Sequence, residues 1–156
     1  MPKLKRYNLP NHAYFITTKT LNNVPLFANE DVAQLFLSTL FELKDRYQFQ
    51  LFSFVIMPDH IHLLLVPSAA YTISALMQKI KGLFAKKYRE YSGNPGSVWQ
   101  KSFYDFVIYS EEKLIEKTLY IHQNPVRRGL VADEKDYKFS SACPGMETDL
   151  GIFLNG

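Results

Sequence analysis

Residues 49–66, FQLFSFVIMPDHIHLLLV, decide the fold that this sequence predicts. The run is rich in β-branched and aromatic residues, and only Pro58-Asp59 interrupts it with a pair that is typical of turns. It therefore predicts two antiparallel strands joined by a tight hairpin. Side chains two residues apart on a strand share a face, so His60 and His62 are expected to point the same way.

Other helices and strands are predicted on both sides of this hairpin. The spacing of their apolar residues distinguishes the helices from the strands. They are a strand over 14–20, a helix from an N-cap at Asn29 to Tyr47, a helix over 73–91, a strand over 103–109, and a helix that Ser110 caps and Pro125 ends. The first six elements match the ferredoxin-like βαββαβ order, an α+β fold with an antiparallel sheet. We expect the strand with the histidines to be central, and the additional C-terminal helix to lie on the open face of the sheet.

Length and composition indicate one domain over 1–156, with a core over about 14–141 and a tail over 142–156. The chain has 156 residues, of which 47% are hydrophobic, enough for a proper core. A single cysteine, Cys143, excludes an intrachain disulfide and a cysteine-based zinc site. The start, Met1 to Arg6, lacks the apolar segment of a secretory signal, and no run approaches the ~20 apolar residues that span a membrane. We expect a soluble cytoplasmic protein without a membrane partner.

Positive charge is concentrated although the net charge is only +3. The clustered cations are Lys79, Lys81, Lys86, Lys87 and Arg89 on the second helix, and Arg127 and Arg128 after the last one. Such clustering suits contacts to nucleic-acid phosphates, although a solvated helix face explains any single lysine equally well. Trp99 could stack on a base or anchor its loop against the core.

The two histidines could bind one divalent cation, with room left for a further ligand, water and a phosphate oxygen. Two ordinary histidines on a polar strand face are the simpler alternative. His12, before the first strand, is expected to face solvent.

The last predicted helix carries two side chains that could complete such a site, a nucleophile and a further metal ligand. At ~100° per residue, Tyr120 and Asn124 lie one above the other on one face. The phenol could attack a phosphate, and the carboxamide could complete the ligand set, with Gln123 as a less well directed substitute. The alternative is a packed aromatic ring and a helix-capping asparagine. The residues expected on the core side are Leu114, Ile115, Thr118, Leu119 and a structural His122.

Several motifs together resemble one family. They are VIMPDHIHLLL around His60 and His62, VWQ at 98–100, FYD at 103–105, YIHQNPVRRGLV at 120–131 and YKFSS at 137–141. In this order they resemble the single-tyrosine HUH transposases, and most closely the REP-associated tyrosine transposases of bacteria. The Tyr-x-x-x-Asn-Pro-Val-x-x-Gly-Leu-Val pattern is the more specific half of the resemblance.

The resemblance implies that His60, His62 and Asn124 bind Mg²⁺ or Mn²⁺ and that Tyr120 is the nucleophile. It implies a nucleoid-associated enzyme, monomer or homodimer, that cuts and rejoins single-stranded DNA beside hairpins through a 5′-phosphotyrosine intermediate. The DNA target, the subunit that supplies the tyrosine, the acceptor of its proton and any present mobility of the element stay open.

The sequence bears on three other classes of protein. An RNA-recognition module would carry stacking aromatics on its first and third strands, where this chain has His60 and His62. A two-histidine phosphodiesterase needs a second His-x-Ser/Thr repeat, which the sequence lacks. A catalytically inactive or regulatory nucleic-acid-binding protein on the same fold remains the main alternative.

Overall fold

The computed structural model describes residues 12–150 and has the predicted order of elements. They are β1 (Tyr14–Lys19), the short 3-10 turns η1 (Leu21–Asn23) and η2 (Leu26–Ala28), α2 (Glu30–Tyr47), β2 (Gln50–Met57), β3 (His60–Val66), α3 (Ile73–Ser92), β4 (Tyr104–Val107), α4 (Glu111–Arg127) and η3 (Glu134–Asp136). The four strands form an antiparallel sheet in the order β2-β3-β1-β4. The predicted α+β fold and the central position of the histidine strand are confirmed. The expectation about Met1 to Arg6 lies outside the described residues.

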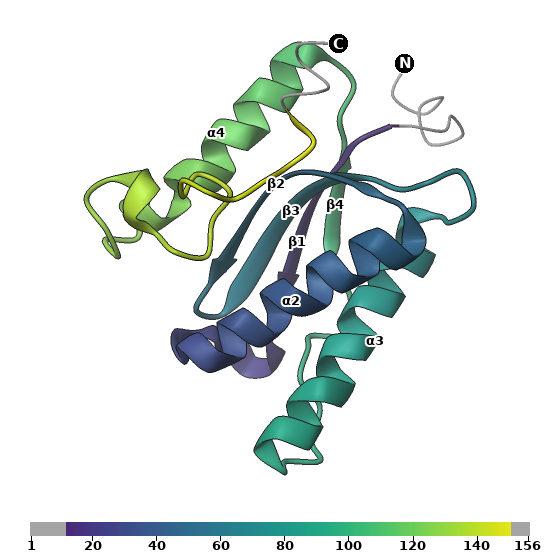
Figure 1. Cartoon of the computed structure of the whole chain (residues 1–156), viewed down its shortest axis with the longest axis vertical. Coiled ribbons are helices and arrows are strands. Elements are labelled where there is room, and N and C mark those ends of the chain that lie inside the picture. Colours follow the sequence, from purple (N-terminus) through teal and green to yellow (C-terminus); the bar gives the residue numbers. More distant parts are fainter. Residues whose placement is uncertain (1–11, 151–156) are drawn as a thin grey trace.

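Helices cover both faces of the sheet, α2 and α3 on one side and α4 on the other (Figure 1). The alternation of side chains along β3 sorts its residues between these layers. Ile61 and Leu63 belong to the large core under α2 and α3, whereas Leu64 belongs to the smaller core under α4. His60 and His62 share the face of Leu64, so both imidazoles point toward the layer that contains α4.

A polar side chain on the residue just before each long helix caps its N-terminus. Asn29 accepts hydrogen bonds from the backbone N–H of Asp31 and Val32, as its position before the helix predicts. Thr72 caps α3 and Ser110 caps α4 in the same manner. The sequence therefore locates the helix starts through their side-chain chemistry.

The end of α4 differs from the prediction, because the helix passes through Pro125 and continues to Arg127. A Schellman motif terminates it: Gly129 has φ +74°, its N–H donates to the carbonyl of Val126, and the N–H of Leu130 donates to that of Pro125. Proline removes one backbone hydrogen bond and its ring crowds the carbonyl four residues earlier, but near the last turn these costs do not end a helix whose final carbonyls are capped. The two extra residues bring Arg127 onto the helix.

The core-facing side of α4 is also rotated from the predicted one. The side chains buried against the sheet are Leu114, Thr118, Ile121, Asn124 and Pro125. Ile115 and Leu119, which were expected inside, are 46% and 50% exposed. The apolar residues of this helix spread over more than one face, and docking on the sheet selects the face that carries Ile121. As a result Asn124 is buried, and Tyr120 lies at the margin of the buried face.

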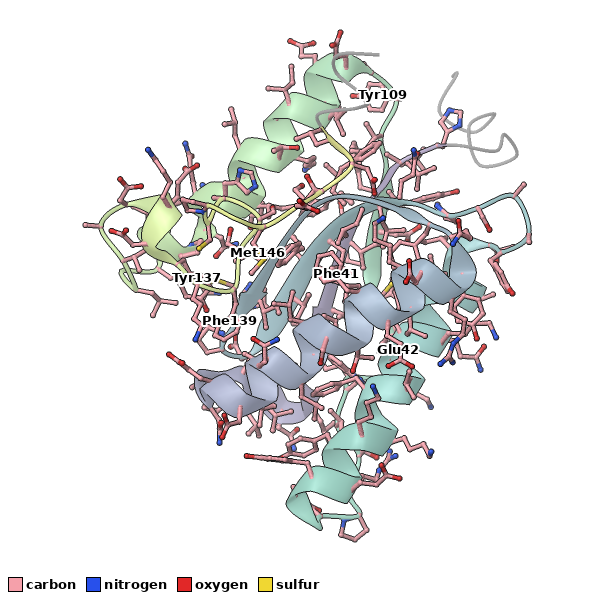
Figure 2. All side chains as sticks on the ribbon, in the orientation of Figure 1. Phe41, Glu42, Tyr109, Tyr137, Phe139 and Met146 are labelled. Carbon is pink, nitrogen blue, oxygen red and sulfur yellow. The ribbon has the colours of Figure 1, made fainter. Side chains whose placement is uncertain are left out.

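Residues 139–149, from the end of the predicted core into the predicted tail, lie along the free edge of β2. The N–H of Ile56 donates to the carbonyl of Phe139, and the N–H of Asp149 donates to that of Leu51. Asp149 also forms an ion pair with Lys44 of α2. Figure 2 shows Tyr137, Phe139 and Met146 gathered between α4 and α2, where they pack on the large core. The segment satisfies backbone groups that an open sheet edge would leave exposed. Its last six residues, 151–156, lie outside the described part of the chain.

Within residues 12–150, no helix is both long and apolar enough to span a membrane.

Candidate active site

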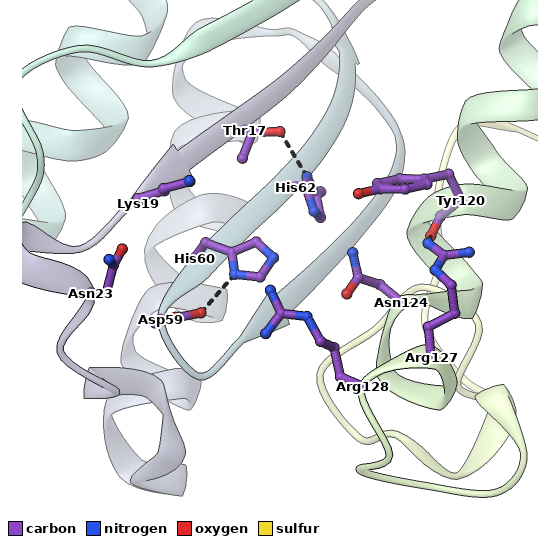
Figure 3. A pocket seen from close by; sticks show the side chains of 10 residues that line it. All are labelled: Thr17, Lys19, Asn23, Asp59, His60, His62, Tyr120, Asn124, Arg127 and Arg128. Atoms are coloured by element: carbon purple, nitrogen blue, oxygen red, sulfur yellow. Dashed lines mark hydrogen bonds and ion pairs between the residues drawn. The ribbon is translucent and has the colours of Figure 1, made fainter.

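The predicted site residues converge on one pocket between the sheet and α4, with a volume of about 480 Å³. It lies where β1 and β3 run side by side under the last turns of that helix (Figure 3). The pocket is lined by Thr17, Lys19, Asn23, Asp59, His60, His62, Tyr120, Asn124, Arg127 and Arg128. Three elements far apart in the sequence therefore supply a histidine pair, a phenol, amides and cations to a single cavity.

The histidine rings lie edge to face, with centroids 4.8 Å apart and ring planes 79° apart. A neighbour holds the Nδ1 atom of each ring: the Asp59 carboxylate oxygen is 2.7 Å from that of His60, and Thr17 Oγ1 is 2.9 Å from that of His62. These contacts leave both Nε2 atoms for another partner. Nε2 of His62 is buried and has no hydrogen-bond partner. A buried polar atom without a partner is costly, which fits a site built for a ligand.

Burial keeps both histidines neutral. Burial is the main cause that lowers the pKa of His62 to about 3, and the positive charge that His60 would carry contributes to the same shift. Burial also lowers the pKa of His60 below its usual range, although the hydrogen bond that His60 donates to the Asp59 carboxylate opposes this shift. Neutral imidazole is the form that binds metal ions, so both rings offer a lone pair at neutral pH.

Tyr120 approaches the pair from α4 of the same chain. Its ring centroid is 5.4 Å from that of His62 and 5.9 Å from that of Phe15. The Arg127 guanidinium carbon lies 4.4 Å from the centre of the phenol ring, and the same side chain donates to the backbone carbonyl of Tyr120. The residue is 42% exposed, so its hydroxyl can meet a substrate in the pocket.

Asn124 lies one turn after Tyr120 and is only 4% exposed, with its amide toward the histidines (Figure 3). Residues 12–150 contain no cluster of three His, Cys, Asp or Glu side chains that could hold a metal ion. Asn124 is the amide side chain that α4 contributes to the pocket beside the histidines. Gln123 is exposed and lines a different pocket, which removes it as a substitute.

Two other histidines lie away from this pocket. Nε2 of His122 is 2.7 Å from Oγ of Ser141, in agreement with a structural role, and burial lowers its pKa. His12 was expected to face solvent, but it is half-buried, and its Nδ1 is buried without a hydrogen-bond partner.

The predicted cations divide into two groups. Arg127 and Arg128 line the pocket, whereas the five cations of α3 belong to the layer on the opposite face of the sheet. Several of the five have partners within the fold: Lys87 pairs with Glu42 of α2 at 2.6 Å, and Lys81 donates to backbone carbonyls. Figure 2 shows Glu42 on the side of α2 that meets α3. The structure thus does not bring Lys79, Lys81, Lys86, Lys87 and Arg89 to the histidines, and their contact with DNA stays a prediction.

Trp99 lies among Phe27, Phe36 and Phe84, with ring centroids 5.5–6.0 Å from its own. Its indole N–H donates to the backbone carbonyl of Lys81 at 3.0 Å. This environment favours the interpretation of Trp99 as an anchor for its loop over a role in base stacking.

Sequence reasoning missed four pocket residues: Thr17, Lys19, Asn23 and Asp59. The alternation of β1 does place Thr17 and Lys19 on one face, which was the available signal. The pairing of Thr17 with His62 and of Lys19 with His60 depends on the strand register, which no local pattern reveals.

Comparisons with known proteins identify the family of this chain. The family model "Transposase IS200 like" matches residues 7–124. A Haemophilus influenzae protein, provisionally named a REP-associated tyrosine transposase, is 28% identical over 138 residues, which are 82% of this chain and 78% of that protein. The REP-associated tyrosine transposase of Escherichia coli is 22% identical over 90% of this chain and 82% of its own length.

Solved structures support the same fold. A REP-associated tyrosine transposase bound to a REP hairpin superposes with a TM-score of 0.75 at 22% identity, over 91% of this chain and 86% of that one. A transposase-like protein of Deinococcus radiodurans gives a TM-score of 0.58 at 21% identity, over 74% of this chain and 92% of its own. The family model covers most of the sequence, including the histidine pair and Tyr120. The chain therefore belongs to the IS200-like transposase family.

Proposed function

We propose that the protein is a metal-dependent transposase that cleaves and rejoins single-stranded DNA next to hairpins, with Tyr120 as the nucleophile. The observation that carries this proposal is the meeting of the phenol with the histidine pair inside one chain, at 5.4 Å between the ring centroids of Tyr120 and His62. A phenol fixed beside two neutral imidazoles and a buried amide suits metal-assisted attack on a phosphodiester. Because these groups come from one chain, a monomer or a homodimer could perform the reaction.

The proposed DNA substrate follows from family membership and from the charges of the pocket. The solved relative described above is bound to a REP hairpin, and we propose a hairpin of that kind as the substrate of this chain. Arg127 and Arg128 line the pocket that holds the histidines, where their guanidinium groups can contact phosphates next to the cleavage site. The cations of α3 are proposed as further contacts to the hairpin stem.

The proposed reaction conserves the phosphodiester bond. The Tyr120 oxygen forms a bond to phosphorus, the bond from phosphorus to the 3′ oxygen breaks, and the products are a 5′-phosphotyrosine and a free 3′-hydroxyl. Attack by another 3′-hydroxyl reverses the step and releases the phenol, so strands are rejoined without ATP. A Mg²⁺ or Mn²⁺ ion held by His60, His62 and Asn124 would supply charge stabilisation to the phosphate oxygens. Arg127 keeps the phenol ring in position by packing on it.

A covalent-trapping assay tests the proposal. A hairpin-bearing single strand, labelled at its 3′ end, is incubated with the protein and Mg²⁺ or Mn²⁺ and analysed under denaturing conditions. We expect labelled protein from the wild type, none from Tyr120→Phe, and none from His60→Ala. Tyr104→Phe is the matched control, because Tyr104 is an exposed tyrosine on the same face of the sheet whose ring lies 6.3 Å from that of Phe15. DNA binding by the wild type without any adduct would favour the alternative of an inactive, regulatory DNA-binding protein.

A further inference from the structure

Lys19 and Tyr120 flank the histidine pair from opposite ends. Along the ladder between β1 and β3, Thr17 pairs with His62 and Lys19 pairs with His60. Alternate residues of β1 share a face at intervals of ~7 Å. The Tyr120 ring contacts Phe15 and His62, at one end of this row, while Lys19 closes the other end (Figure 3). A phosphate held over the histidines would have the phenol on one side and the ammonium group on the other.

The ammonium group of Lys19 is available to a substrate. The side chain is exposed and lines the pocket together with Asn23. Within residues 12–150 no ion pair engages Lys19, in contrast to Lys87, which a carboxylate holds at 2.6 Å. A lysine side chain has three N–H donors and can give a proton to an oxygen that develops negative charge.

The backbone around Lys19 is firmly held. Its carbonyl accepts a hydrogen bond from the N–H of Gln100. In the following turn, Oγ1 of Thr20 lies 2.7 Å from the carbonyl of Val24 and 3.1 Å from that of Asp59, which ties the turn to the β2–β3 hairpin. Asn23 has φ +56°, a left-handed conformation that asparagine tolerates, and thereby joins the lining of the pocket.

Phosphoryl transfer places the entering and leaving oxygens roughly in line on opposite sides of phosphorus. We propose that Lys19 is a catalytic residue that protonates the leaving 3′ oxygen while Tyr120 attacks, and that Asn23 contacts the nucleotide bearing that oxygen. This inference rests on the proposed function. The phenol of Tyr120 gives its proton to solvent water as its oxygen bonds to phosphorus. As the bond from phosphorus to the 3′ oxygen breaks, its electron pair takes a proton from the ammonium group, which leaves a 3′-hydroxyl and a neutral amine. In the rejoining step the amine takes a proton from the attacking 3′-hydroxyl, and the released phenol regains its proton from water.

The proposal also fixes the direction of the DNA strand. The nucleotide on the 3′ side of the cut stays attached to Tyr120, next to Phe15. The nucleotide on the 5′ side carries the leaving oxygen, and it lies over Lys19 and Asn23.

A substrate with sulfur in place of the bridging 3′ oxygen tests this role, because a thiolate leaves without protonation. Adduct formation is timed for the wild type and Lys19→Gln on both substrates, and each variant is compared with the wild type on the same substrate. We expect Lys19→Gln to slow cleavage of the oxygen substrate about 100-fold. On the sulfur substrate it should match the wild type within a few fold.

Lys117→Gln is the matched control. Lys117 is a cation on the same side of the sheet, beside Phe15 and Phe106, but outside the pocket. Lys117→Gln should slow adduct formation on the oxygen and sulfur substrates equally, or leave both unchanged, as expected for the loss of a charge alone. Equal slowing of both substrates by Lys19→Gln, or no slowing of either, would overturn the role of Lys19. Absence of any adduct from the wild type would count instead against the proposed transposase activity.

Discussion

Thr17 and His62 lie opposite each other on adjacent strands, and Oγ1 of Thr17 is 2.9 Å from Nδ1 of His62. The contact fixes the orientation of the ring and keeps Nε2 directed into the pocket. Since that Nε2 atom has no hydrogen-bond partner, the threonine prepares the histidine for an external ligand.

Thr17→Val should weaken the binding of Mn²⁺ to the DNA-free protein about 10- to 100-fold, the usual effect of losing such a supporting contact. Titration calorimetry measures the change, and Thr17→Ser should bind like the wild type. Thr18→Val is the control, since Thr18 is buried and the alternation of β1 turns it away from the pocket. Equal affinities for the Thr17→Val variant and the wild type would show that this contact does not position a ligand.

Arg128→Gln should reduce both the affinity for single-stranded hairpin DNA and its dependence on salt. Loss of one phosphate contact lowers the slope of log K against log salt by about 0.7. Lys87→Gln should have a smaller effect, because Glu42 already pairs with Lys87. Fluorescence anisotropy at several salt concentrations compares the two. A larger change of slope for Lys87→Gln would place the main DNA contact on α3.

Tyr137→Phe should make stability less sensitive to alkaline pH. Burial raises the pKa of Tyr137 to about 12, and its hydroxyl donates to the carbonyl of Ile56 at 2.7 Å. The unfolded chain loses this proton near pH 10, so the contribution is complete below pH 10 and is lost as pH rises toward 12. Between pH 8 and 11 the wild type should lose about 1 kcal/mol more than the variant in urea unfolding. Parallel losses would contradict a buried, protonated Tyr137.

Mixing Tyr120→Phe with His60→Ala should not restore adduct formation, because both groups act within one chain. Each variant lacks one part of the site, and only an exchange of α4 between subunits could reunite the two parts. Recovery of a substantial fraction of wild-type adduct in the mixture would show that the active site is shared between subunits.

The sequence predicts the layers of this fold well, because caps and apolar periodicity are local signals. Asn29 and Ser110 begin their helices as expected, and the alternation around His60 and His62 identifies their common face. The face of α4 that packs on the sheet is harder to predict, since Ile115 and Leu119 are as apolar as the buried Ile121. Only docking on the sheet distinguishes them. Gly129, rather than Pro125, was the useful signal for the end of the helix.

The site is predictable where its residues belong to motifs and obscure where they depend on pairing. Tyr120 and Asn124 follow from helical spacing beside the histidine pair. Lys19 depends on the register between β1 and β3, and Asn23 on a left-handed turn. The positive charges of α3 are evident in the sequence, but the face of the sheet that this helix covers is a property of the whole fold.

Peptide mapping of the trapped adduct tests the central claim most directly. The wild-type protein is allowed to react with hairpin DNA and a divalent cation, the DNA is digested to a short remnant, and the modified residue is located by mass spectrometry. Our account predicts a nucleotide joined through its 5′ phosphate to Tyr120, and no such product after His60→Ala. A nucleotide attached to another residue, or an unchanged yield of adduct from the His60→Ala protein, would contradict it.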